Sequence, residues 1–180
     1  MWVADTTSSV HNECAFDDCW IEIGYGTFAP GTSPNPSCNT YVVCYFWADN
    51  RPNGGYHEHD LEVVPSGDYG YLTDVYIWWQ GASIWNVELS SNSGFTYENQ
   101  SKDNPFNPKY IRVGTELAGT TGASSYPANF DYNQWEENGN WQYQTNSGTV
   151  QQQWPIVAYW LTPPASGNYG GDFYTCEPCA

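Results

Sequence analysis

The sequence predicts an all-β protein, built as an antiparallel β-sandwich or jelly roll. Short runs of β-branched and aromatic residues alternate with Gly/Pro/Asn/Ser turns at intervals of about eight to twelve residues. No stretch carries the sustained i, i+3, i+4, i+7 apolar pattern of an amphipathic helix, so helix content should be small. Aromatic residues make up 18% of the chain and charged residues 13%, which is typical of a folded protein with a large core.

The chain of 180 residues fits one domain, because no shift of composition and no long linker marks a second one. We therefore expect a single sandwich over residues 1–180. Residues 1–18 are polar and without periodicity, which indicates an N-terminal arm or a short edge strand. Residues 163–180 are expected to form a C-terminal tail that carries Cys176 and Cys179.

The opening strand, residues 19–28, carries a carboxylate in an apolar and aromatic run that ends in glycines. Alternation along a strand places Trp20, Glu22, Gly24 and Gly26 on one face and the isoleucines on the other. Glycines beside a polar group leave room for a ligand to approach closely. Further strands are expected at 40–49, 56–64, 71–80, 83–90, 95–100, 110–117, 130–135, 141–145 and 155–161, with a hairpin turn at Gly81-Ala82.

Charge and cysteine content limit the classes of function. Four basic against twenty acidic residues give a net charge of −16, which repels nucleic acid and anionic membrane surfaces. No apolar run reaches the ~18–20 residues of a membrane span. Six cysteines lie in three close pairs along the sequence, Cys14/Cys19, Cys38/Cys44 and Cys176/Cys179. Their even number favours a secreted, disulfide-bonded protein over a metal site at the single C-x-x-C, but six cysteines allow 15 connectivities and the sequence does not choose among them.

A second glutamate, Glu116, lies among small and apolar residues much as Glu22 does. If the two meet in one aromatic cleft, both cannot ionise cheaply, so one stays protonated as an acid while the other accepts a proton from water. Such a pair suits hydrolysis near acidic pH. The alternative for either glutamate alone is an outward-facing, solvated strand residue.

Two short segments resemble glutamic peptidases. Residues 20–26 (WIEIGYG) resemble the Glu-x-Gly-Trp segment of the neprosin family, and residues 113–117 (VGTEL) resemble its Trp-Gly-Gly-Glu-Val segment, with Tyr25 and Thr115 in place of that family's Trp and Gly. The eqolisins have an analogous Gln-Ala-Gly and a later Ala-Glu-Trp. This resemblance implies a concanavalin-like jelly roll that cleaves peptide bonds without a cofactor, with Glu22 and Glu116 as the catalytic acids.

Tryptophans are the candidate walls of a site for an extended peptide or protein substrate. The candidates are Trp20, Trp47, Trp78 and Trp85, and the alternative for each is a place in the core of the sandwich. The same aromatic residues would also suit stacking on sugars, and two carboxyls ~5–9.5 Å apart would suit a glycosidase.

Two other interpretations stay open. His57 and His59 point the same way along a strand, which makes them weak candidates for metal ligands without zincin spacing. The alternative to an enzyme is a non-enzymatic extracellular β-sandwich that binds carbohydrate or self-assembles as a surface structure.

Overall fold

The fold is nearly all β, as the sequence predicts. The computed structural model describes residues 1–5, 19–51, 55–69, 71, 73–104, 110–112, 125–130, 134–143, 157–160 and 173–177. Among these residues the only helical segments are two short 3-10 turns, η1 (Pro36–Cys38) and η2 (Ser66–Asp68). None of the described helices is long and apolar enough to cross a membrane. The chain divides into two compact units, Met1–Arg112 and Val113–Ala180.

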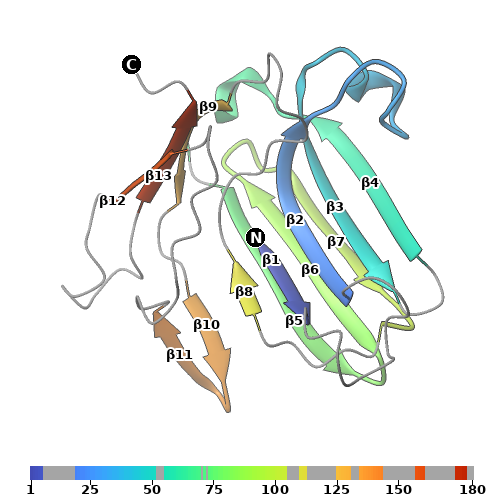
Figure 1. Cartoon of the computed structure of the whole chain (residues 1–180), viewed down its shortest axis with the longest axis vertical. Helices are drawn as coiled ribbons and strands as arrows, with labels where there is room; N and C mark the ends of the chain where they lie inside the picture. Colours follow the sequence, from blue (N-terminus) through green and yellow to red (C-terminus); the bar gives the residue numbers. More distant parts are fainter. Residues whose placement is uncertain are drawn as a thin grey trace. The chain divides into compact units, whose positions relative to one another are not determined.

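The first unit contains a five-stranded antiparallel sheet with the strand order β4-β3-β2-β1-β8. Its long strands β2, β3 and β4 run side by side in Figure 1. The first strand lies between β2 and β8, so residues expected in an arm or an edge strand occupy an interior position of this sheet. The bounds are β1 Trp2–Asp5, β2 Cys19–Thr27, β3 Val43–Arg51, β4 Gly55–Val63 and β8 Tyr110–Arg112.

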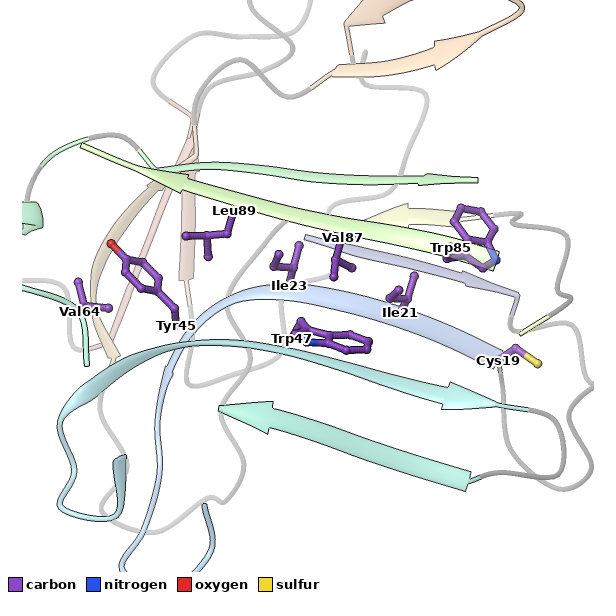
Figure 2. Packing of buried hydrophobic residues seen from close by; sticks show 9 residues of the cluster. All are labelled: Cys19, Ile21, Ile23, Tyr45, Trp47, Val64, Trp85, Val87 and Leu89. Carbon is purple, nitrogen blue, oxygen red and sulfur yellow. The ribbon is translucent and has the colours of Figure 1, made fainter. Parts of the chain in front are cut away.

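A three-stranded antiparallel sheet of β5 (Thr73–Gly81), β6 (Ile84–Ser91) and β7 (Thr96–Ser101) packs against the first sheet. Figure 2 shows the core between them, with side chains of β2 and β3 facing those of β6. The buried cluster is apolar apart from the polar tips of its rings, so removal of its surface from water drives the two sheets together. Its members are Cys19, Ile21, Ile23, Tyr45, Trp47, Val64, Trp85, Val87 and Leu89.

Alternation along β2 is as the sequence predicts. Ile21 and Ile23 are buried in the core, whereas Glu22 between them is half-buried and belongs to the opposite face. Because a shift of one residue would exchange the two faces, burial of the isoleucines fixes the face on which Glu22 lies.

The second unit contains a three-stranded sheet with the order β12-β13-β9 and a separate hairpin of β10 and β11. Of the expected strand at 130–135, Phe130 belongs to β9 and residues 134–135 belong to β10, and the residues between them lie outside the described part of the chain. Within the expected C-terminal tail, β13 is the middle strand of its sheet. The bounds are β9 Ser125–Phe130, β10 Gln134–Glu137, β11 Asn140–Tyr143, β12 Val157–Trp160 and β13 Phe173–Glu177.

Cys38 and Cys44 form a disulfide, with Cα atoms 6.0 Å apart, which confirms the expected disulfide bonding and supplies a connectivity that the sequence left open. Cys19 is also disulfide-bonded. Cys14 and Cys179 lie outside the described residues, as does the side chain of Cys176, so the connectivity of the remaining four cysteines stays open.

Candidate active site

The candidate site is the face of β2, β3 and β4 that points away from the core, which we call the Glu22 face. Residues paired across neighbouring strands share a face of the sheet, so the register gives the layout. Three rows follow one another along the strands: Trp20–Asn50–Tyr56, Glu22–Ala48–Glu58 and Gly24–Phe46–Asp60.

Two carboxyls lie in the middle row. Glu22 on β2 and Glu58 on β4 both pair with Ala48 on β3, so Ala48 lies between them in the row. Their Cα atoms are two strand spacings apart, about 10 Å. Ala48 is fully buried and contributes only a methyl group to the space between the two longer side chains. The arrangement therefore brings two half-buried carboxyls to opposite sides of one small residue.

Tyr56 lies close to both carboxyls. Its hydroxyl donates a hydrogen bond to Oε2 of Glu58, and its ring packs at a tilt against Trp20, with ring centroids 5.6 Å apart. Burial raises the pKa of Tyr56, and the hydrogen bond to Glu58 and the negative charges of Glu58 and Glu22 raise it further. The phenol therefore stays protonated and acts as a hydrogen-bond donor.

The surroundings of Glu58 and Asp60 raise the pKa of both carboxyls. Burial raises the pKa of Glu58, the charge of Asp60 raises it further, and the hydrogen bond from Tyr56 opposes the shift. Burial also raises the pKa of Asp60, partly offset by the Ser33 hydroxyl and by His59. Asp60 is only 9% exposed, and neither of its carboxylate oxygens makes a regular hydrogen bond within the described part of the chain.

Small residues form the floor of the site, and aromatic pairs lie at its ends. A Cβ added to Gly24 would meet no atom within 4 Å, whereas one added to Gly26 would contact the rings of Phe28 and Phe46. Those two rings pack edge to face, with centroids 5.8 Å apart. The open position at Gly24 therefore lies between this pair and the Trp20–Tyr56 pair, next to the row of carboxyls.

The amino group of Met1 also lies near Glu22. It donates a hydrogen bond of 2.8 Å to the backbone oxygen of Ile23. Burial lowers the pKa of this amino group to about 6, and the negative charge of Glu22 opposes the shift. Below about pH 6 the amino group is therefore a cationic neighbour of the Glu22 carboxyl.

The predicted site residues have different locations. Trp20 lies on the Glu22 face, whereas Trp47 (1% exposed) and Trp85 (4% exposed) lie in the core. Trp78 is 42% exposed on the outer face of the β5-β6-β7 sheet, away from the core. Glu116 lies outside the described residues. The catalytic and substrate-binding roles assigned to these residues stay predictions.

The two candidate metal-binding histidines lie on the core side of β4. The ring of His59 stacks on Trp47, with centroids 4.1 Å apart, and burial lowers its pKa. Nδ1 of His57 lies 3.4 Å from Oδ1 of the buried Asp49. In the described part of the chain, no three His, Cys, Asp or Glu residues are grouped so that they could hold a metal ion.

Tyr56 and Glu58 are residues of this face to which the sequence assigned no role. Their alternation along the strand is visible in the sequence and indicates a polar face. It does not reveal which neighbouring strand that face adjoins. Only the register of β4 on β3, and of β3 on β2, brings Glu58 into the row of Glu22.

The fold is similar to that in the crystal structure of aspergilloglutamic peptidase from Aspergillus niger, with a TM-score of 0.54. The chain has a glutamic peptidase-like fold. The similarity covers 97% of this chain and 95% of that chain at 9% sequence identity, so it supports the fold and does not transfer individual residues. No family model matches the sequence, and no curated protein matches it. The expected likeness to glutamic peptidases is supported at the level of fold, and the specific likeness to neprosin stays a prediction.

Proposed function

We propose that the protein is a secreted, acid-active endopeptidase of the glutamic peptidase type, with Glu22 and Glu116 as its catalytic carboxyls. The observation that carries the proposal is the position of Glu22, half-buried in the middle of a sheet, beside small residues and between two aromatic pairs, in a fold similar to that of a glutamic peptidase. A disulfide between Cys38 and Cys44 is compatible with secretion.

The proposed chemistry needs one ionised and one protonated carboxyl. Ionised Glu22 removes a proton from a water molecule, whose oxygen attacks the carbonyl carbon of the peptide bond. The protonated carboxyl of Glu116 donates its proton to the leaving nitrogen as the carbon–nitrogen bond breaks. The products are a carboxylic acid and an amine, and the two glutamates have exchanged one proton. A second proton transfer through water restores the starting state.

The test is digestion of a denatured protein substrate at pH 3–5. Removal of a general acid or base lowers the rate by about 10²–10⁴-fold, so Glu22→Gln and Glu116→Gln should each lose most of the activity. Matched controls are Glu98→Gln and Glu136→Gln, because both residues are exposed strand glutamates outside the Glu22 face. Equal cleavage by wild type and Glu22→Gln would contradict the proposal.

One observation favours a second function, carbohydrate binding on the outer face of the β5-β6-β7 sheet. Tyr76 and Trp78 are each 42% exposed there, two residues apart on one strand. Beside them, the Gln100 side-chain amide donates to Gln80 and to Asn86, both at 3.0 Å. Flat rings next to ordered amides are suited to stacking on sugars and bonding their hydroxyls.

Binding to insoluble cellulose, chitin and xylan tests this alternative. Trp78→Ala should abolish retention of the protein on at least one of them. Trp141→Ala is the matched control, because Trp141 is exposed on β11 and belongs to neither face discussed here. Equal retention of both variants, or no retention of wild type, would contradict carbohydrate binding at this face.

A further inference from the structure

We propose that Glu58, held by Tyr56, is an additional carboxyl of the Glu22 site that titrates together with Glu22 and donates a hydrogen bond to the backbone of a bound peptide. This inference rests on the proposed function and names a substrate-binding residue for it. Neither the sequence motifs nor the similarity of fold assigns a role to Glu58.

The geometry of the sheet places the two carboxyls on either side of one small residue. Glu22 and Glu58 extend from the same face on either side of Ala48, in one row of the register. With Cα atoms about 10 Å apart, two glutamate side chains can reach toward the same bound group from opposite sides. The side chain between them is a methyl group, so it fills little of that space.

Tyr56 sets the orientation of the Glu58 carboxyl. It donates to Oε2, and the packing of its ring on Trp20 restricts the position of the hydroxyl. The Tyr56 hydroxyl can donate to Oε2 in two cases: when Glu58 is ionised, or when neutral Glu58 carries its proton on Oε1. The proton of neutral Glu58 is therefore expected on Oε1, from which it can be donated to a ligand.

The electrostatic surroundings of Glu58 differ from those of Glu22. On its own strand Glu58 interacts with Tyr56 and Asp60. Glu22 lies across Ala48 in the same row of the register, and its charge acts on the amino group of Met1 and on Tyr56. The β3 residues between them are Phe46, Ala48 and Asn50, none of which titrates. Burial and the charge of Asp60 thus raise the pKa of Glu58, whereas Glu22 has an amino group as a neighbour that is cationic below about pH 6.

Space for a ligand lies next to Glu22 along β2. The open position at Gly24 has no atom within 4 Å of where a Cβ would lie. An extended peptide at the open Gly24 position would place backbone carbonyls beside the carboxyl row. A protonated carboxyl can donate a hydrogen bond to such a carbonyl oxygen, whereas an ionised carboxylate has no proton to donate.

The deciding experiment compares pH profiles of kcat/KM for wild type, Glu58→Gln, Glu58→Ala and the control Glu62→Gln, an exposed glutamate on the same strand. Glutamine keeps a donor that does not ionise, so Glu58→Gln should stay within about threefold of wild type at acid pH and keep its activity to higher pH than wild type. Glu58→Ala should lose about tenfold, mainly through a higher KM. Glu62→Gln should match wild type.

Two kinetic results would overturn the inference. If the pH profile of kcat/KM for Glu58→Gln overlays that of wild type, the ionisation of Glu58 has no effect on substrate binding or cleavage. If Glu58→Gln is as inactive as Glu22→Gln at every pH, Glu58 transfers its proton and does not merely bind the substrate.

A second measurement does not depend on activity. Titration of ¹³C-carboxyl-labelled glutamates by NMR should show a lower midpoint for Glu58 in Glu22→Gln than in wild type, because interacting carboxyls titrate as a coupled pair. An unchanged midpoint overturns the shared site even if the protein cleaves peptides. A shifted midpoint in a protein that cleaves nothing supports the shared carboxyl site and rejects the peptidase function.

Discussion

Asp49 is a carboxylate placed where the core would ordinarily exclude one. Its side chain is fully buried on β3, and Nε of Arg51 donates to its Oδ2 at 2.7 Å. His57 approaches the other oxygen from the neighbouring strand. A buried charge requires such a partner, because transfer of an unpaired carboxylate from water costs several kcal/mol. Arg51 therefore allows Asp49 to be tolerated in the core.

Arg51→Met should lower the free energy of unfolding by about 3 kcal/mol, since it leaves the carboxylate of Asp49 buried with only His57 nearby. Adding Asp49→Asn should recover part of the loss, because the amide carries no charge. Urea unfolding at pH 7 measures both effects. Lys102→Met removes an exposed cation and serves as the control. An Arg51→Met variant as stable as that control would show that the ion pair contributes nothing.

At the scale of elements, turn chemistry connects the strands of the β5-β6-β7 sheet. The β5–β6 hairpin turns at Ala82 and Ser83, one residue later than the expected Gly81-Ala82, and both have positive φ, 51° and 64°. Two consecutive left-handed residues are the signature of a type I′ turn, for which Asn-Gly is the favoured sequence. The β10–β11 hairpin has that sequence at Asn138-Gly139, with φ of 54° and 77°.

Replacing Ala82-Ser83 by Asn-Gly should therefore stabilise the protein. The left-handed conformation costs an ordinary residue about 1–2 kcal/mol, and relief of part of this strain should raise the free energy of unfolding by about 1 kcal/mol. Thermal unfolding followed by circular dichroism measures the gain. Asn92→Gly is the control, because Asn92 is an exposed residue of the next turn without a positive φ, so added flexibility should leave stability unchanged or lower. A decrease for Asn-Gly would contradict the turn assignment.

At the scale of the whole molecule, charge couples the stability of the fold to pH. With a net charge of −16, ionised carboxyls repel one another at neutral pH, and this repulsion decreases as the pH falls. Asp60 and Asp68 act in opposite directions. Burial raises the pKa of Asp60 from 3.8, so its ionised form disfavours folding. Burial opposes ionisation of Asp68 as well, but hydrogen bonds from Ser93, Ser91 and Tyr45 outweigh it and lower its pKa.

The melting temperature should therefore rise as the pH falls from 7 toward 4 and decrease again below that. Because the pKa of Asp60 is raised in the folded state, its contribution to stability is lost as the pH rises above 3.8. Asp60→Asn should therefore reduce the fall in melting temperature between pH 4 and pH 7. Because the pKa of Asp68 is lowered in the folded state, its contribution to stability is lost as the pH falls below 3.8. Asp68→Asn should therefore reduce the fall in melting temperature below pH 4. Differential scanning calorimetry from pH 2 to pH 7 measures both. A melting temperature that falls steadily from pH 7 to pH 4 would contradict this expectation.

The sequence by itself determined the local features of this protein. Alternation located the long strands to within about three residues and placed Glu22 on the face opposite the isoleucines. The even number of cysteines indicated disulfide bonding, although only the structure identified the Cys38–Cys44 bond. These features depend on neighbours in the chain, so periodicity and spacing carry the information needed to predict them.

Only the tertiary structure decided which residues share a site. The sequence does not distinguish Trp47 and Trp85, which pack in the core, from Trp78 and Trp20, which do not. It shows that Glu58 lies on a polar face, but not that this face adjoins that of Glu22. Strand pairing and sheet packing join residues that are distant in the sequence, and those contacts are selected by the burial of the whole core rather than by any local pattern.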